Sequence, residues 1–225
     1  MKRSPCLRWL PSSALLFAAC AAGNYRADLA QNDVLYRDVE FRSKAPGDRK
    51  VFVAPCLDAR DAGTLPDHEG NFPIVYGGDE FWDRPVTDMI GDVLARQLTD
   101  SGLFAAVTDT ASADVLVLQP SVVHFVAAAK QGLSGAASFA EVGLRLTVWG
   151  PSVGGGERQQ LWEQTFTGAN GSDFAVKPPS PYRLVGRALQ QAMGRALAGL
   201  DGSNVGRSSV PINLPGAREA SAPRR

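Results

Sequence analysis

Two stretches of the chain place apolar residues at the three- and four-residue spacing of an amphipathic helix. In the first stretch, the apolar positions are Val86, Met89, Ile90, Val93, Leu94 and Leu98. In the second stretch, they are Leu184, Val185, Ala188, Leu189, Ala192, Met193, Ala196, Leu197 and Leu200. We expect Asp83 to cap the first helix and Gly102 to end it. Ser180 followed by Pro181 predicts the start of the second helix, whose arginines lie off the apolar stripe.

Other stretches alternate apolar and polar residues as half-buried strands do. The clearest is Ser138–Trp149, in which Val142, Leu144, Leu146 and Val148 face one side and Glu141, Arg145 and Thr147 the other. Further strands are predicted over 34–41, 51–54, 114–126 and 160–167. The element order, two strands, a helix, a further run of strands and a second helix, predicts an α+β fold. We expect a mainly antiparallel sheet with two helices on one face.

The amino terminus has the layout of a secretory signal peptide over residues 1–19. Lys2, Arg3 and Arg8 make it basic, and a short apolar run over 9–19 ends in small residues. This run is shorter than the ~20 residues that span a bilayer. A buried amino-terminal helix is the alternative, and Pro11 inside the run disfavours it.

Residues 16–20, LFAAC, resemble the lipobox of bacterial lipoproteins, in which apolar and small residues precede a cysteine. The resemblance implies that Cys20 becomes the first mature residue and carries acyl chains. Phe17 departs from the aliphatic residue usual at that position. Ala21, in place of Asp, implies sorting to the outer membrane, with the protein on its periplasmic face. Ordinary signal cleavage nearby, with Cys20 incidental, is the alternative.

Composition divides the rest of the chain and excludes some functions. Residues 20–32 are small and polar and are predicted to be a lipid-anchored tether, and residues 201–225 a disordered tail. A single α+β domain is expected over 33–200. The 225 residues carry 23 basic and 23 acidic side chains, so the net charge of zero argues against nucleic-acid binding.

The residue types that carry chemistry are few. With Cys6 in the signal peptide and Cys20 acylated, Cys56 has no disulfide partner and is predicted to be buried at a strand end. His68 lies in a long loop, 56–81, beside Asp67 and Glu69, where a metal site is conceivable. A solvated acidic loop is the simpler interpretation, because no second histidine lies near. His124 is interpreted as a strand histidine.

Other candidate motifs are rejected. Gly154–Gly156 lies between two strands and lacks the lysine of a phosphate-binding loop. Ser134 is not in a nucleophile elbow. We therefore expect no catalytic residue, no metal and no cofactor. Trp149 and Trp162 are predicted to lie on adjacent strands, where they could pair, either in the core or as an exposed aromatic surface.

Residues 74–200 resemble the auxiliary lipoproteins of ABC-type lipid transport. The resemblance is carried by FWDRPVTDMIGDVLARQLTDSGLF at 81–104, by ADVLVLQPSVVHFV and FAEVGLRLTVWG, and by LWEQTFTG with the final helix. The VFVAPCLDARDAG stretch at 51–63 resembles a wider group of envelope lipoproteins with the fold of the TolB amino-terminal domain. The acidic loop over 57–80 departs from the transport members.

These resemblances imply a non-enzymatic adaptor, anchored in the membrane, that binds a protein partner in a cell-envelope complex. Two alternatives stay open. One is a periplasmic module that binds a lipid or glycan. The other is a structural or activating lipoprotein of peptidoglycan or surface-polymer assembly.

Overall fold

Two helices and a mixed β-sheet make up the part of the chain that the structure, a computed structural model, describes. The described residues are 28–60, 71–74, 84–132, 135–152, 156–173, 175 and 180–208. They have the α+β fold that the sequence predicts. The predicted signal peptide and Cys20 lie outside these residues.

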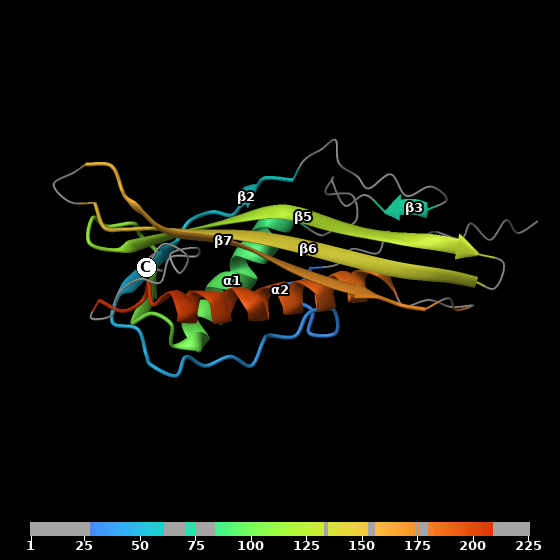
Figure 1. Cartoon of the computed structure of the whole chain (residues 1–225), viewed down its shortest axis with the longest axis horizontal. Helices are drawn as coiled ribbons and strands as arrows, with labels where there is room; N and C mark the ends of the chain where they lie inside the picture. Colours follow the sequence, from blue (N-terminus) through green and yellow to red (C-terminus); the bar gives the residue numbers. More distant parts are fainter. Residues whose placement is uncertain are drawn as a thin grey trace, which may run out of the picture.

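The sheet has the strand order β4-β1-β5-β6-β7, and two short strands pair with β5 beyond its partner β1. In chain order the strands are β1 (Lys50–Val53), β2 (Leu57–Asp58), β3 (Asn71–Ile74), β4 (Ala106–Thr108), β5 (Leu116–Gly132), β6 (Gly135–Trp149) and β7 (Gln160–Gly171). The pairs β5·β6, β6·β7 and β3·β5 are antiparallel. The pairs β1·β4, β1·β5 and β2·β5 are parallel and short, so the sheet is mainly antiparallel. Figure 1 shows β5, β6 and β7 as three long strands that run side by side.

A proline lies inside β5 at a position where no neighbouring strand needs its backbone N–H as a hydrogen-bond donor. The residues of β5 up to Leu118 pair with β1, and those from Ser121 pair with β2. Pro120 falls in the interval between them, so its missing N–H costs no ladder hydrogen bond. The register of β5 with β6 shifts between Val122 and His124, which marks a bulge shortly after this proline.

Both helices begin and end close to the predicted residues. Helix α1 (Val86–Ser101) is followed by Gly102 in the left-handed conformation, with φ of 71°. Helix α2 (Pro181–Ser203) has Ser180 at its N-cap and Pro181 in its first turn. The predicted cap at Asp83 is wrong, because the N-cap position of α1 is Pro85.

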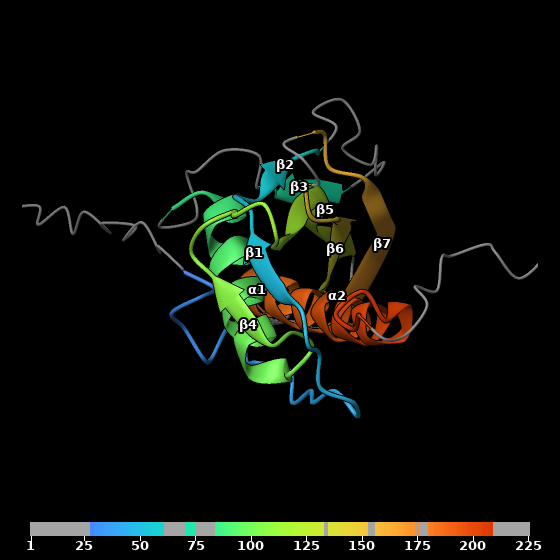
Figure 2. The ribbon, with the colours of Figure 1, turned by 90° about the vertical axis from the view of Figure 1, so that its left-hand side faces the viewer.

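A single hydrophobic core lies between the helices and one face of the sheet. Alternate residues of β6 supply it: Val142, Leu144, Leu146 and Val148 are at most 2% exposed. The apolar stripes of α1 and α2 enter the same core. Figure 2, which looks along the strands, shows α2 directly beneath β6 and β7. The contact is closest at Gly168 of β7, where a Cβ atom would overlap the Ala188 carbonyl of α2.

The strand predicted over 34–41 is not formed. Residues 32–36 make turns, and 37–43 run without a strand partner. Leu35 and Tyr36 are buried against the helices, and the Gln97 side chain of α1 accepts a hydrogen bond from the Val39 N–H. Because helices and not strands surround this segment, its apolar side chains dock on them while its backbone joins no sheet.

The folded unit extends beyond the predicted limits of 33–200 at both ends. Leu29 is fully buried, and the neighbouring Asp28 accepts a hydrogen bond from Arg84 at 2.7 Å. Val205 is also fully buried, and Arg207 pairs with Asp201 at the end of α2. Short segments assigned to the tether and to the tail are therefore part of the domain, because single apolar residues in them complete the core.

Candidate functional site

The face of the sheet opposite the helices carries polar residues across the middle of its long strands, with Val126 and Trp149 also on this face. In each of the three long strands, every second residue points into the core, and the residues between them form this face. Gln119, Thr147 and Glu163 form one row across β5, β6 and β7. Ser121, Arg145 and Thr165 form the next row. No helix in the described part of the chain covers this face, so we call it the open face.

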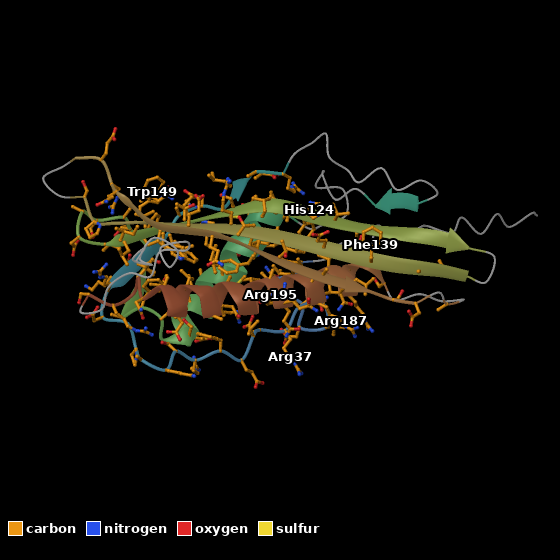
Figure 3. All side chains as sticks on the ribbon, viewed as in Figure 1. Arg37, His124, Phe139, Trp149, Arg187 and Arg195 are labelled. Carbon is orange, nitrogen blue, oxygen red and sulfur yellow. The ribbon has the colours of Figure 1, made fainter. Side chains whose placement is uncertain are left out.

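Hydrogen bonds within the open face hold its side chains in place. Thr147 Oγ1 donates to Glu163 Oε2 at 2.8 Å across β6 and β7. Further along, His124 Nε2 lies 3.5 Å from Glu141 Oε2. In Figure 3 His124 and Trp149 lie on the upper side of the strands, away from α2. His124 thus lies in a strand, as the sequence indicated, and its neighbour across the strands is a carboxylate.

One edge of the sheet is the strand β7, which in the described chain pairs only with β6. Ala54 donates to the Leu118 carbonyl, so the even residues of this part of β5 direct their backbone groups toward β1. The odd residues of β5 therefore bond to β6, and the even residues of β6 bond to β7. By the same alternation, the N–H and C=O groups of Glu163 and Thr165 point away from the sheet. We call these two residues the free edge.

The rest of this edge is covered by side chains of α2. Arg195 donates to the Thr167 carbonyl, and Gln191 accepts from the Ala169 N–H. These contacts confirm that odd residues of β7 face outward. Among the described residues, no such contact reaches the backbone of the free edge.

Cys56 is a free cysteine in the half-buried link between β1 and β2. Burial raises the pKa of its thiol to about 12, and the nearby Asp58 carboxylate adds to the effect. A thiol with this pKa is protonated at neutral pH, so it is a poor nucleophile. Its burial at a strand end agrees with the sequence prediction.

A cavity of about 430 Å³ lies between this link and α1. Arg84, Asp88 and Asp92 contribute polar groups to its wall, and Cys56 closes one side. Arg84 is already paired with Asp28 and Asp92, at 2.7 and 2.6 Å. Its charge is therefore neutralised by residues of the chain itself.

The remaining sequence candidates are placed as follows. His68 lies outside the described residues, as do Cys20, Ser134 and Gly154. Within the described part, no group of three His, Cys, Asp or Glu side chains could hold a metal ion. No helix of that part is long and apolar enough to cross a membrane.

The predicted pairing of Trp149 with Trp162 is wrong. Trp162 pairs with Val148, whereas Trp149 pairs with Gln160, and the register shifts between them. The two rings therefore lie on opposite faces. Trp162 is 2% exposed in the core, with its ring centroid 6.0 Å from that of Phe166. The sequence showed that the strands are neighbours but could not show their register, which places Val148 and not Trp149 opposite Trp162.

Comparisons with known proteins give weak matches of structure. No family model and no curated protein matches the sequence. A crystal structure of a Xanthomonas campestris protein of the DUF330 family matches with a TM-score of 0.47 and 20% identity, covering 73% of this chain and 89% of that chain. A hypothetical protein from Chlamydia trachomatis matches with a TM-score of 0.40 and 9% identity, covering 70% and 98%. Both are bacterial proteins, and similarity at this level says nothing about function.

Proposed function

We propose that this chain is a non-enzymatic lipoprotein of the outer membrane, anchored through Cys20, that binds a partner protein of a cell-envelope complex. The complex that we propose is an ABC-type lipid transporter, in which the chain acts as an accessory subunit. The basis for the anchor is the lipobox resemblance at residues 16–20. The basis for the transporter is the resemblance over residues 74–200.

The observation that carries the partner-binding proposal is the free edge of β7. An extended segment of a partner can add to a sheet edge through backbone hydrogen bonds. Glu163 and Thr165 offer two outward-facing residues for such a ladder. The exposed side chains of Glu163 and Thr165 lie on the open face beside it, where they can contact the partner's side chains.

The chemistry of the described residues favours binding over catalysis. Cys56 is held as a protonated thiol, and in the described part of the chain no serine, threonine or cysteine side chain is hydrogen-bonded to His124 or Glu141. The cavity next to Cys56 has a mainly apolar wall, to which Arg84, Asp88 and Asp92 add charged groups. The choice of a protein partner therefore rests on the free edge of β7 and not on this cavity.

The test is photo-crosslinking in bacterial cells that express the full chain. A photoreactive amino acid replaces the exposed Gln160 at the start of β7, so that a bound partner is captured beside the free edge. Thr165→Pro then removes one outward N–H. Because this position does not bond to β6, the sheet itself should persist.

We expect a discrete adduct with the unmodified edge and its loss in the proline variant. Thr165→Val, which keeps the N–H and the side-chain shape, is the matched control and should retain the adduct. An adduct that survives Thr165→Pro would rule out binding at this edge. Intact mass of the membrane fraction, with and without Cys20→Ser, tests the anchor separately, because acylation adds mass only at that cysteine.

A further inference from the structure

The solvent-exposed side of α2 carries a row of arginines. Arg183, Arg187 and Arg195 are exposed and lie four or eight residues apart, with exposed Gln191 between them. Residues spaced by four lie on one side of a helix, so the row extends over about 18 Å along its axis. We call these three residues the arginine row.

In the part of the chain that the structure describes, no acidic side chain neutralises the arginine row. The only carboxylate in α2 is Asp201, in its last turn, and Arg207 and Ser43 already bond to it. Arg195 donates to a backbone carbonyl of β7, which leaves its charge unbalanced. Among the described residues, Arg183 and Arg187 contact no acidic side chain. With the whole chain at zero net charge, this concentration of positive charge is a local feature of α2.

The segment beneath α2 adds charge of both signs. Exposed Arg37 lies next to the helix, because its carbonyl accepts a hydrogen bond from Gln190. The exposed carboxylates of this segment are Asp33 and Glu40, and its other exposed cations are Arg42 and Lys44. Figure 3 shows Arg187 and Arg195 on α2 and Arg37 below it, on the side away from His124 and Trp149.

The amino-terminal end of the domain lies on this same side. Leu35 packs so closely on α2 that a Cβ atom at Gly186 would overlap its carbonyl. In Figure 1 the first described residues, in blue, lie beneath the amino-terminal half of α2. Asp28 follows Cys20 by eight positions, and a fully extended chain spans at most ~3.6 Å per residue. An acylated Cys20 would therefore hold this side within about 30 Å of the bilayer.

We propose that the arginine row binds the anionic phospholipid headgroups of the membrane in which the protein is anchored. The inference rests on the proposed lipid anchor, which brings the domain to a bilayer. Basic side chains close to a bilayer surface are attracted to its anionic headgroups through their charge. With α2 on the membrane, the open face points away from the bilayer and the free edge lies to its side. A partner can reach both.

The test is co-sedimentation of the full chain carrying Cys20→Ser, which cannot be acylated, with vesicles. One set contains phosphatidylglycerol in phosphatidylcholine, and the other contains phosphatidylcholine alone. We expect preferential binding to the anionic vesicles that weakens with salt. Arg187→Gln should weaken that binding about fivefold, and Arg183→Gln with Arg187→Gln more than tenfold.

Two variants separate this proposal from a general effect of charge. Arg145→Gln removes one positive charge from the open face and should leave vesicle binding unchanged. Arg187→Lys keeps the charge and should bind like the parent. Equal losses for Arg187→Gln and Arg145→Gln, or no loss for the double variant, would overturn the proposal. Because no partner protein is present, failure here is distinct from failure of crosslinking at the free edge.

Discussion

The two faces of the sheet differ sharply although they are built from the same strands. In β6, Leu144 and Leu146 point into the core and are almost fully buried, while Arg145 between them lies on the open face. The helices cover the first face so tightly that Gly168 contacts the α2 backbone. Apolar burial on one face therefore supplies the stability of the domain, and the other face is left free for polar contacts.

The glycines Gly168 and Gly143 test this difference most strongly. Gly168 faces α2, and an added methyl would overlap the Ala188 carbonyl, which backbone shifts must relieve. We expect Gly168→Ala to destabilise the domain by about 3 kcal/mol or more, at the upper end of overpacking costs. Gly143 lies on the open face, where a Cβ atom would meet the Val123 side chain at 2.9 Å.

His124 Cβ follows at 3.0 Å, and the nearest backbone atom, His124 N, is 3.4 Å away. Because no backbone atom overlaps the added methyl, Gly143→Ala should cost about 1 kcal/mol, the lower end of the same range. Urea unfolding of both variants, followed by circular dichroism, measures the two values. Equal destabilisation would mean that the open face is packed as tightly as the helix face and would contradict the comparison.

A second pair of changes compares adjacent residues of β6. Leu146→Ala removes a side chain that is fully buried beneath the sheet. We expect a loss of about 3 kcal/mol in the free energy of unfolding, from lost burial and the remaining cavity. Arg145→Ala, one residue away on the open face, should change it by less than about 0.5 kcal/mol. Thermal unfolding checks both, and a large effect of Arg145→Ala would show that the open face contributes to the core.

The smallest effect concerns the thiol of Cys56, which lies against α1 near Gly91. Burial raises its pKa to about 12, so the folded state holds the proton more tightly than the unfolded state does. Stability from this group is complete below its ordinary pKa near 9 and is lost as the pH rises toward 12. Between pH 9 and about 12, the free energy of unfolding should therefore fall more in the parent protein than in the Cys56→Ala variant.

Alkylation provides the direct measurement for Cys56. Iodoacetamide at pH 9 should modify it slowly in the folded chain and rapidly in urea, because only the thiolate reacts. The Cys6→Ser, Cys20→Ser background leaves Cys56 as the reacting thiol. Rapid modification of the folded chain would show that the helix side opens readily near α1.

Much of the fold follows from local sequence patterns. The apolar spacing in α1 and α2 placed both helices to within a few residues, and Gly102 ended α1 as expected. The alternation of residue types in β6 was enough to assign its side chains to the two faces of the sheet. These features depend on residues within a few positions of each other, and so the chain itself carries them.

The candidate sites were less accessible to sequence analysis. The arginines of α2 were visible as off-stripe residues, but their freedom from carboxylates depends on what packs around the helix. The free edge of β7 could not be predicted at all, since its alternating pattern is the same whether one or two strands flank it. The sequence offered one signal for the arginine row, namely arginines at four- and eight-residue spacing in a helix that has no carboxylate near them.

By itself, the sequence determined the helices, the long strands and the division of their residues into apolar and polar faces. The tertiary structure decided which elements meet. It docked residues 34–41 on the helices and not in the sheet, and it placed Trp149 and Trp162 on opposite faces. It also left β7 at the edge. The reason is physical: local patterns fix which side of a segment is apolar, whereas pairing and register depend on the joint packing of distant segments.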